Sequence, residues 1–399
     1  MNPPTDLSQR ESKVIAALTV HGVLPPPVTG MTACTQSLIE LTRPLLKVDS
    51  YNWSNSMPKI TPRFRLAKLV RALGSPWKLL FSRRAEQHVF YMPANSGLAL
   101  YLNMFAIAAA RIRGYRCALH HHIYTYLNRY DWRIELLDLL LGQNGLHLVL
   151  CPHMEQQLRA LYSCRPAIAV VPSSIQLLQS SFAKDDPVPL SALPQRFRLG
   201  HIANLSIAKG LPIAIDTLRA LRQAGSDVQL VLAGPVQSQV EQRMIVEAQA
   251  EFGSALEYRG PVYGAEKRRF YDEVHVVLFP TRYPDAQPLV VTEAFGCGRP
   301  VLSYGRGCIP GMMGARAEWS IDPSADFVAQ ATRQIRSWEE DGRAFAAACL
   351  YARQRYEQML ADADSAINDF VTWVRGRGTD GFEHQDSQAQ LSSLRNVGL

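Results

Sequence analysis

The feature that most constrains the fold is a regular alternation of short apolar segments with helical segments between residues 197 and 303. The expected strands cover 197–203, 228–233, 255–259, 275–280 and 300–303. The expected helices cover 209–224, 236–252, 264–273 and 288–297. Short apolar strands joined by helices build a parallel sheet with helices on its faces. We therefore predict a doubly wound α/β domain, with its ligands at the carboxyl ends of the strands.

The first half of the chain repeats this alternation less regularly. Strands are expected at 14–24, 89–92, 117–124, 146–150 and 167–171, helices at 34–46, 97–113 and 131–143, and a polar loop at 48–62. A chain of 399 residues is about the length of two domains. The predicted fold class is α/β, with two doubly wound, Rossmann-like parallel-sheet domains that face each other across a cleft.

The expected boundaries follow from composition. An N-terminal domain covers 1–185, and a linker rich in Pro, Asp and Ser covers 181–196. A C-terminal domain covers 197–355 and a terminal helix 356–375, within a strongly helical region that begins at 324. The tail 376–399 is polar, so we expect it to be disordered.

Cysteine usage and hydropathy indicate a cytoplasmic protein. The seven cysteines are scattered and form no C-x-x-C pair, so we predict neither a disulfide framework nor a zinc site. The polar N-terminus lacks the apolar core of a signal peptide. No segment reaches the ~18 apolar residues that a membrane-spanning helix needs. We interpret residues 98–110 as a buried helix.

Charge is distributed unevenly between the two halves. Residues 1–185 contain 20 Lys and Arg against 10 Asp and Glu, whereas the remainder contains 22 against 25. We therefore expect an anionic partner for the first half, namely a membrane surface, a lipid phosphate or a nucleic acid.

Three segments of the second half carry residues suited to binding a phosphorylated ligand. Lys209 and Gly210 follow a strand and open a helix, whose N-terminus favours phosphate, although an exposed lysine at an ordinary turn is the alternative. Gly234 ends the next strand and allows a ligand to approach the backbone closely. Asp285 precedes a helix that contains Glu293, a carboxylate among apolar residues. Such a carboxylate needs donors, either the hydroxyls of a ribose or a structural arginine such as Arg299.

Together these segments resemble the family 4 glycosyltransferases of the GT-B fold. The resemblance rests on six linked motifs in residues 197–310: Lys209-Gly210, Leu232-Ala233-Gly234, Gly260-Pro261-Val262, Phe279-Pro280-Thr281, Asp285 with Glu293-Ala294, and Gly298-Arg299-Pro300-Val301. The first half is similar more loosely, through a Pro/Gly loop that ends at Gly30, a histidine-rich strand and the sequence VPSSI at 171–175. Two positions depart from the family pattern, since Asp285 replaces the usual Glu and Asn204 replaces a frequent Arg.

The resemblance implies a retaining glycosyltransferase with a UDP- or GDP-linked sugar donor and no metal or other cofactor. Glu293 would hold the ribose, Lys209 the diphosphate, and Asp285 the hydroxyls of the donor sugar. The remaining predicted donor-binding positions are Gly30, Asn204, Gly234, Ala286, Gln287, Pro288 and Leu289. The catalytic positions would be Asp285 and His122. The only D-x-D, at 362–364, lies in a predicted helix and is interpreted as chance.

The histidine-rich segment is CALHHHIYTYL at 117–127. In a strand, His120 and His122 share one face and His121 lies on the other. Adjacent histidines do not have a familiar zinc spacing, so the alternatives are structural histidines or, by resemblance, His122 beside the donor sugar.

The stretch 59–85 contains eight basic residues and no acidic residue. Leu66, Leu69, Val70 and Leu73 have helical spacing, and Gly74-Ser75-Pro76 is expected to break this helix. The predicted membrane or acceptor contacts are Arg65, Lys68, Arg71, Trp77 and Lys78. Basic residues beside aromatic ones suit a membrane interface, although a solvated basic face is the alternative.

The resemblance and the basic stretch together predict a peripheral enzyme on the inner face of the cell membrane. By resemblance, its partners would be a nucleotide sugar, a lipid-linked saccharide acceptor and anionic lipid, in surface or exopolysaccharide synthesis. A soluble acceptor and a catalytically weakened scaffold subunit are the alternatives. No G-x-G-x-x-G follows the first strand, which argues against a dehydrogenase, and the single basic stretch argues against nucleic-acid binding.

Overall fold

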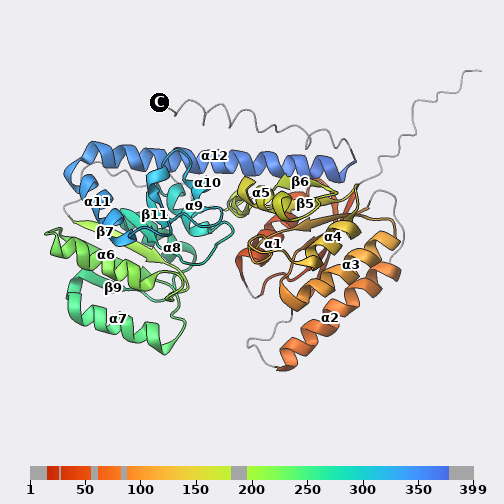
Figure 1. Ribbon diagram of the computed structural model, residues 1–399, viewed down its shortest axis with the longest axis horizontal. Helices are drawn as coiled ribbons and strands as arrows, with labels where there is room; N and C mark the ends of the chain where they lie inside the picture. Colours follow the sequence, from red (N-terminus) through yellow and green to blue (C-terminus); the bar gives the residue numbers. More distant parts are fainter. Residues whose placement is uncertain (1–15, 27, 55–61, 82–87, 181–195, 377–399) are drawn as a thin grey trace, which may run out of the picture.

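A computed structural model describes residues 16–26, 28–54, 62–81, 88–180 and 196–376. It contains two six-stranded parallel sheets with helices on their faces, in the orders β2-β1-β3-β4-β5-β6 and β12-β11-β10-β7-β8-β9. Figure 1 shows the two sheets in separate lobes, bridged by helix α12. The fold class predicted from the sequence is confirmed. All but the last residue of the predicted linker and all but the first residue of the predicted tail lie outside the described residues.

The elements of the first domain follow the expected alternation. Its strands are β1 Ala17–Gly22, β2 Lys47–Asn52, β3 His88–Pro93, β4 Arg116–His120, β5 Leu146–Val149 and β6 Ala167–Val170. Its helices are α1 Gly30–Thr42, α2 Pro62–Phe81, α3 Leu100–Ile112, α4 Trp132–Leu141 and α5 Pro152–Leu161, with short 3-10 turns at Gly97–Ala99 and Ser173–Leu177.

The second domain matches the predicted ranges more closely. Its strands are β7 Phe197–Ile202, β8 Val228–Ala233, β9 Leu256–Tyr258, β10 Val276–Phe279, β11 Val301–Tyr304 and β12 Ser320–Ile321. Its helices are α6 Leu211–Gln223, α7 Gln239–Phe252, α8 Gly264–Glu273, α9 Leu289–Gly296, α10 Ile309–Met313, α11 Phe327–Glu340 and α12 Gly342–Val374, with 3-10 turns at Gly253–Ala255 and Ala317–Trp319.

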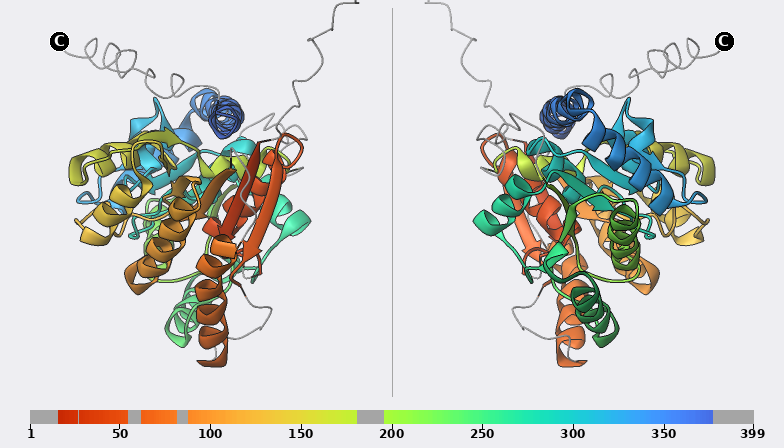
Figure 2. Two further views of the ribbon diagram at one scale, coloured as in Figure 1. Left: turned by 90° about the vertical axis from the view of Figure 1, so that its right-hand side faces the viewer. Right: turned by 90° about the vertical axis from the view of Figure 1, so that its left-hand side faces the viewer.

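Helix α12 connects the two domains. Phe345, Ala352 and Met359 belong to the core of the second domain, whereas Ile367 and Trp373 belong to a core around β1 of the first. Arg116 of β4 donates to the carbonyl oxygen of Trp373 at 2.5 Å. Figure 2 shows the helix end-on, above both lobes. Residue 355, where we placed the end of the second domain, lies inside this continuous helix.

Two sequence expectations for the first domain are wrong. Residues 48–52, expected in a loop, form with Lys47 the edge strand β2, which pairs with β1 along its whole length. Helix α2 continues through Pro76 instead of breaking at residues 74–76. Packing requires small residues at positions 74 and 75 of this helix. Ser75 is buried and hydrogen-bonded to His21 Nδ1 at 2.6 Å, and a Cβ at Gly74 would lie only 2.9 Å from the Tyr51 hydroxyl.

Helix α3 is buried on one face, so the interpretation of residues 98–110 as a buried helix holds for that face alone. Asn103 is buried and bonded to the Pro93 carbonyl and to Asn95, whereas Leu98 and Phe105 are mostly exposed. Within the described residues, no helix combines the length and hydropathy that crossing a membrane requires.

Cys151 and Cys308 form one disulfide, although the scattered cysteines led us to predict no disulfide framework. Their Cα atoms lie 6.1 Å apart although 157 positions separate them in the sequence. Sequence spacing gave no signal, because the pair forms only when the two domains meet.

Candidate active site

The predicted donor residues lie where β7, β8 and β10 end. Gly210 caps α6 with a φ of +90°, and a Cβ there would overlap the Pro280 carbonyl at the end of β10. Gly234 follows β8 with a φ of +121°, and a Cβ there would overlap the Ala203 carbonyl after β7. Only glycine allows both close approaches. These two glycines therefore bring three strand ends together at the predicted site.

Lys209 and Asp285 form an ion pair at this edge. Lys209 Nζ lies 2.5 Å from Asp285 Oδ1 and 2.7 Å from Oδ2, and the Thr281 hydroxyl donates to Oδ2 at 3.0 Å. The two side chains are 26% and 16% exposed, so a ligand can still reach them. The roles predicted for Lys209 and Asp285 are therefore physically coupled, which the sequence did not indicate.

Glu293 is buried in α9 and pairs with two residues of α8. Lys267 forms an ion pair with its Oε1, and the Tyr271 hydroxyl donates to Oε2 at 3.1 Å. Burial raises the pKa of the Glu293 carboxyl, although the positive charge of Lys267 opposes the shift.

The alternative pairing of Glu293 with Arg299 is wrong. The Arg299 guanidinium instead donates to the carbonyl oxygens of Tyr271 and Asp272, at 2.9 and 3.0 Å. The sequence signalled that Glu293 needs a partner, but which cation of α8 supplies it depends on how α8 packs against α9.

Residues 286–289 lead into the N-terminus of α9, with Pro288 as its N-cap. Pro288 has no N–H group, so any amides for a phosphate come from its neighbours. The Gln287 side chain is already engaged, because its Oε1 accepts from the backbone N–H and the hydroxyl of Ser173, at 2.5 and 2.9 Å. Gln287 thus links the two domains. Asn204 is exposed in the loop between β7 and α6.

The three adjacent histidines follow the predicted alternation, although β4 ends at His120 rather than at 124. The rings of His120 and His122 lie 4.1 Å apart, whereas His121 bonds to Tyr126 and His147 on the other side. Burial lowers the pKa of His120 to about 3 and that of His122 well below its ordinary value. His122 Nε2 is buried without a partner among the described residues, so one nitrogen of this neutral ring is unsatisfied.

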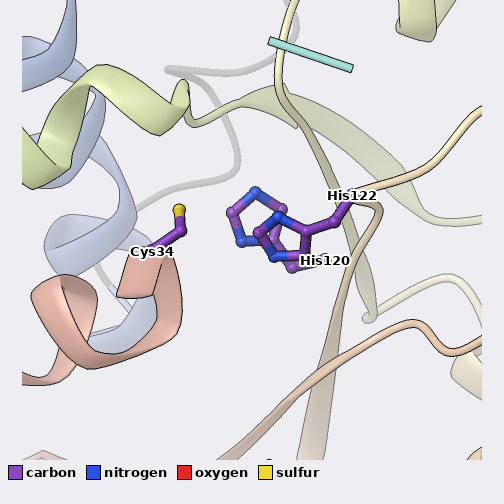
Figure 3. A group of neighbouring side chains, drawn as sticks. All are labelled: Cys34, His120 and His122. Carbon is purple, nitrogen blue, oxygen red and sulfur yellow. The ribbon is translucent and has the colours of Figure 1, made fainter. Parts of the chain in front are cut away.

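Cys34 of α1 completes a buried cluster with His120 and His122, whose potential ligand atoms lie within 4.8 Å of one another. Figure 3 shows the two rings beside each other, with the cysteine on the neighbouring helix. Both ring nitrogens of His120 are hydrogen-bonded, Nδ1 to the Tyr91 hydroxyl at 2.8 Å and Nε2 to the Val171 carbonyl at 3.2 Å. Cys34 and His122 are then the two remaining candidate ligands, fewer than the three or four protein ligands of a zinc site. We therefore retain the prediction of a metal-free site.

Gly30 is the first residue of α1, capped by Thr29, whose side chain accepts from the Thr32 backbone. It is exposed, and a Cβ there would meet no atom within 4 Å, so packing alone does not require glycine. Its predicted role near the donor stays a prediction.

Sequence reasoning missed a contact between the two sides of the site. A Cβ at Gly307, which has a φ of +58°, would overlap the Asp285 carbonyl and lie 3.0 Å from the Tyr124 ring. Tyr124 follows His122 by two residues. The loop carrying His122 and the segment carrying Asp285 are therefore neighbours across the domain boundary.

Helix α2 presents an exposed surface with basic and aromatic side chains. Trp77 stacks on Phe81, and both are mostly exposed, as is Val70. Lys78 lies 4.7 Å from the centre of the Tyr51 ring, and Arg71 donates to the Ser54 carbonyl. Arg65 and Lys68 lie on the same helix, in its first turns, where side chains are outside the description.

Comparison with known proteins identifies the second domain. Residues 196–337 match the family described as "Glycosyl transferases group 1". The C-terminal domain is therefore similar to group 1 glycosyltransferases. The amylovoran biosynthesis glycosyltransferase AmsK of Erwinia amylovora is 25% identical over 150 residues, which span 36% of this chain and only 37% of AmsK.

About nine tenths of the chain is similar in fold to solved proteins of the GT-B fold. Anabaena HepE in complex with UDP and glucose aligns with a TM-score of 0.63 and 14% identity, covering 90% of this chain and 99% of HepE. Sucrose-phosphate synthase of Thermosynechococcus elongatus aligns with a TM-score of 0.64 and 16% identity, covering 90% and 98%. At this identity the similarity establishes the two-domain GT-B fold.

Proposed function

We propose that this protein is a retaining glycosyltransferase that moves a sugar from a UDP- or GDP-linked donor to a lipid-linked saccharide. The Lys209–Asp285 pair carries the proposal, because it lies at the strand ends of a domain similar to group 1 glycosyltransferases. The complexes of HepE with UDP and glucose support a nucleotide-sugar donor.

In this proposal Lys209 and the N-terminus of α9 bind the diphosphate. The positive end of the helix dipole and the free N–H groups favour an anion there. Lys209 adds a point charge, once the phosphate competes with Asp285 for the ammonium group. Stabilising the developing charge on the leaving diphosphate in this way lowers the barrier to sugar transfer.

Glu293 receives the ribose. Lys267 and Tyr271 occupy one site on each carboxylate oxygen. An ionised carboxylate offers about four acceptor sites, so acceptor capacity remains for ribose hydroxyls. The two protein partners hold the carboxylate in place before the nucleotide arrives.

Asp285 and His122 bind the donor sugar. Because the pKa of His122 is lowered, its imidazole is neutral at pH 7 and suits a sugar hydroxyl better than a phosphate. Asp285 accepts a hydrogen bond from the sugar on the opposite side of the boundary. The sugar then lies between the two domains, where water is excluded before transfer.

The proposed acceptor is supported by the exposed side chains of α2 and by the similarity to AmsK. The exposed Trp77 and Phe81, beside Lys78 and Arg71, suit reversible attachment to anionic lipid at the cytoplasmic membrane face. The name of AmsK refers to amylovoran biosynthesis, which favours surface or exopolysaccharide synthesis for this chain as well.

A nucleotide-sugar screen tests the proposal. UDP- and GDP-linked sugars are offered to the full chain in the presence of a chelator, and nucleoside diphosphate release is measured. Proton NMR of the transferred or hydrolysed sugar then gives the anomeric configuration. We expect release without metal and retention of configuration. A strict metal requirement, an inverted product, or no binding of any nucleotide would each contradict the proposal.

A further inference from the structure

The disulfide between Cys151 and Cys308 is a covalent link between the two domains. Cys151 is the N-cap of α5, two residues after the end of β5 of the first sheet. Cys308 precedes α10, in the loop after β11 of the second sheet. Both sulfurs therefore lie at the carboxyl ends of strands, the edges where the two domains meet. Domains joined by limited contacts move relative to each other by default, and this bond restrains that motion.

Among the described cysteines, Cys151 and Cys308 are the only pair joined by a disulfide. Cys34, Cys117, Cys164, Cys297 and Cys349 are free. Burial raises the pKa of the Cys34, Cys117 and Cys297 thiols to about 12, and that of Cys164 and Cys349 to about 11. Thiols with raised pKa values react slowly, since the thiolate is the nucleophile.

Tyr124 connects the disulfide with the candidate active site. Its hydroxyl lies 3.6 Å from Cys151 Sγ and 3.4 Å from Cys308 Sγ. Burial raises the pKa of Tyr124, so the hydroxyl stays protonated and can donate to a thiolate formed on reduction. Tyr124 also contacts Gly307, whose backbone abuts Asp285.

A cavity of about 720 Å³ gives access to the bond. Both cysteines line it, together with Gln287 and Arg355. This volume is within the range of small-molecule sites, so a low-molecular-weight thiol fits. Arg355 supplies a positive charge for a carboxylate of such a thiol.

We propose that Cys151–Cys308 is a reversible redox latch that holds the domains together and slows nucleotide exchange. One thiolate attacks the disulfide to give a mixed disulfide, and a second displaces it. The overall reaction converts the protein disulfide and two small thiols into two protein thiols and one small-molecule disulfide, with electrons and protons balanced. The reverse reaction, with glutathione disulfide as oxidant, closes the latch. The effect on nucleotide exchange rests on the proposed function, whereas the effect on domain motion does not.

The test uses the full chain equilibrated in reduced or oxidised glutathione buffer. Peptide mass spectrometry after alkylation under denaturing conditions reads the state of the bond. Hydrogen exchange is compared at residues 152–156, 285–289 and 308–313, and dissociation of fluorescent UDP and GDP is timed. In the oxidised protein we expect slower hydrogen exchange and nucleotide dissociation about tenfold slower, equivalent to about 1.4 kcal/mol.

Matched variants separate the latch from general thiol effects. Cys308→Ser should behave as the reduced protein in both buffers, whereas Cys349→Ser should respond as the wild type does. A bond that fails to form in oxidised buffer, or equal hydrogen exchange in both states, would overturn the latch. If no nucleotide binds to either the oxidised or the reduced protein, the proposed function fails. The difference in hydrogen exchange between the two states then tests the latch proposal by itself.

Discussion

The coupling between Lys209 and Asp285 leads to a prediction that separates diphosphate binding from turnover. Lys209→Met removes a charged hydrogen-bond donor for the diphosphate, so nucleoside diphosphate binding should weaken by about 1.5–3 kcal/mol. This loss corresponds to a roughly 10- to 150-fold higher Kd. Asp285→Asn instead removes the carboxylate that holds Lys209 Nζ at 2.5 and 2.7 Å in the free protein.

The effect of Asp285→Asn on binding follows from the exposure of the pair. Because both side chains are partly exposed, their mutual attraction is worth at most about 1 kcal/mol. Freeing Lys209 from this competition should leave the Kd unchanged or lower it, by no more than about fivefold. The kcat should nevertheless fall, because Asp285 is proposed to bind the donor sugar in the transition state.

Calorimetry with UDP and GDP in the presence of a chelator measures the Kd of each variant, and donor hydrolysis measures kcat. Arg219→Met is the matched control, since Arg219 forms an exposed ion pair with Glu251 at 2.7 Å on the outer surface. If Asp285→Asn weakens diphosphate binding as much as Lys209→Met does, the two residues bind the diphosphate as a unit. Our division of roles between diphosphate and sugar would then be refuted.

Three further predictions follow from other parts of the structure. The pKa of Glu293 is raised in the folded state, so the native protein binds more protons there than the unfolded chain does. The free energy of unfolding should therefore fall as the pH rises above the ordinary pKa of 4.5. Denaturant titrations at several pH values should show that Glu293→Gln removes this dependence. Gly210→Ala should lower stability by more than 1 kcal/mol, since it combines a positive φ with overlap at Pro280, while Gly225→Ala, with a positive φ but open surroundings, should cost less. The double variant Arg71→Gln and Lys78→Gln should weaken the free energy of binding to anionic vesicles by about 1 kcal/mol per charge, measured by sedimentation, without changing nucleotide affinity. If the wild-type protein does not bind such vesicles at low salt, the membrane proposal is contradicted.

The sequence predicted the second domain well because its strands are continuous apolar runs bounded by turn residues. Both faces of a parallel sheet are covered by helices, so β8, β10 and β11 show almost no polar interruption. Edge strand β2 was missed for the opposite reason: KVDSYN is largely exposed and polar, and only pairing with β1 defines it.

The sequence could single out candidate residues by type, but it could not predict how they pair. Glu293 was recognised as a carboxylate that needs donors, yet its partner Lys267 lies on a different helix. The Cys151–Cys308 and Tyr124–Gly307 contacts were equally out of reach, because each joins the two domains. Periodicity reports the environment of a residue within its own element, whereas such contacts depend on how elements pack.

The structure also bears on the departure at residue 285, where the family that the sequence resembles usually has Glu. Three neighbours fix the Asp285 segment: the Lys209 ammonium, the Thr281 hydroxyl and the backbone at Gly307. With the main chain held this close to Gly307, the short side chain of Asp already places both carboxylate oxygens on Lys209. A Glu at this position would carry its carboxylate one methylene further and would have to leave this geometry or bend to keep it. The contacts with Lys209 and Thr281 therefore fit the shorter residue, which argues against interpreting Asp285 as a mark of lost activity.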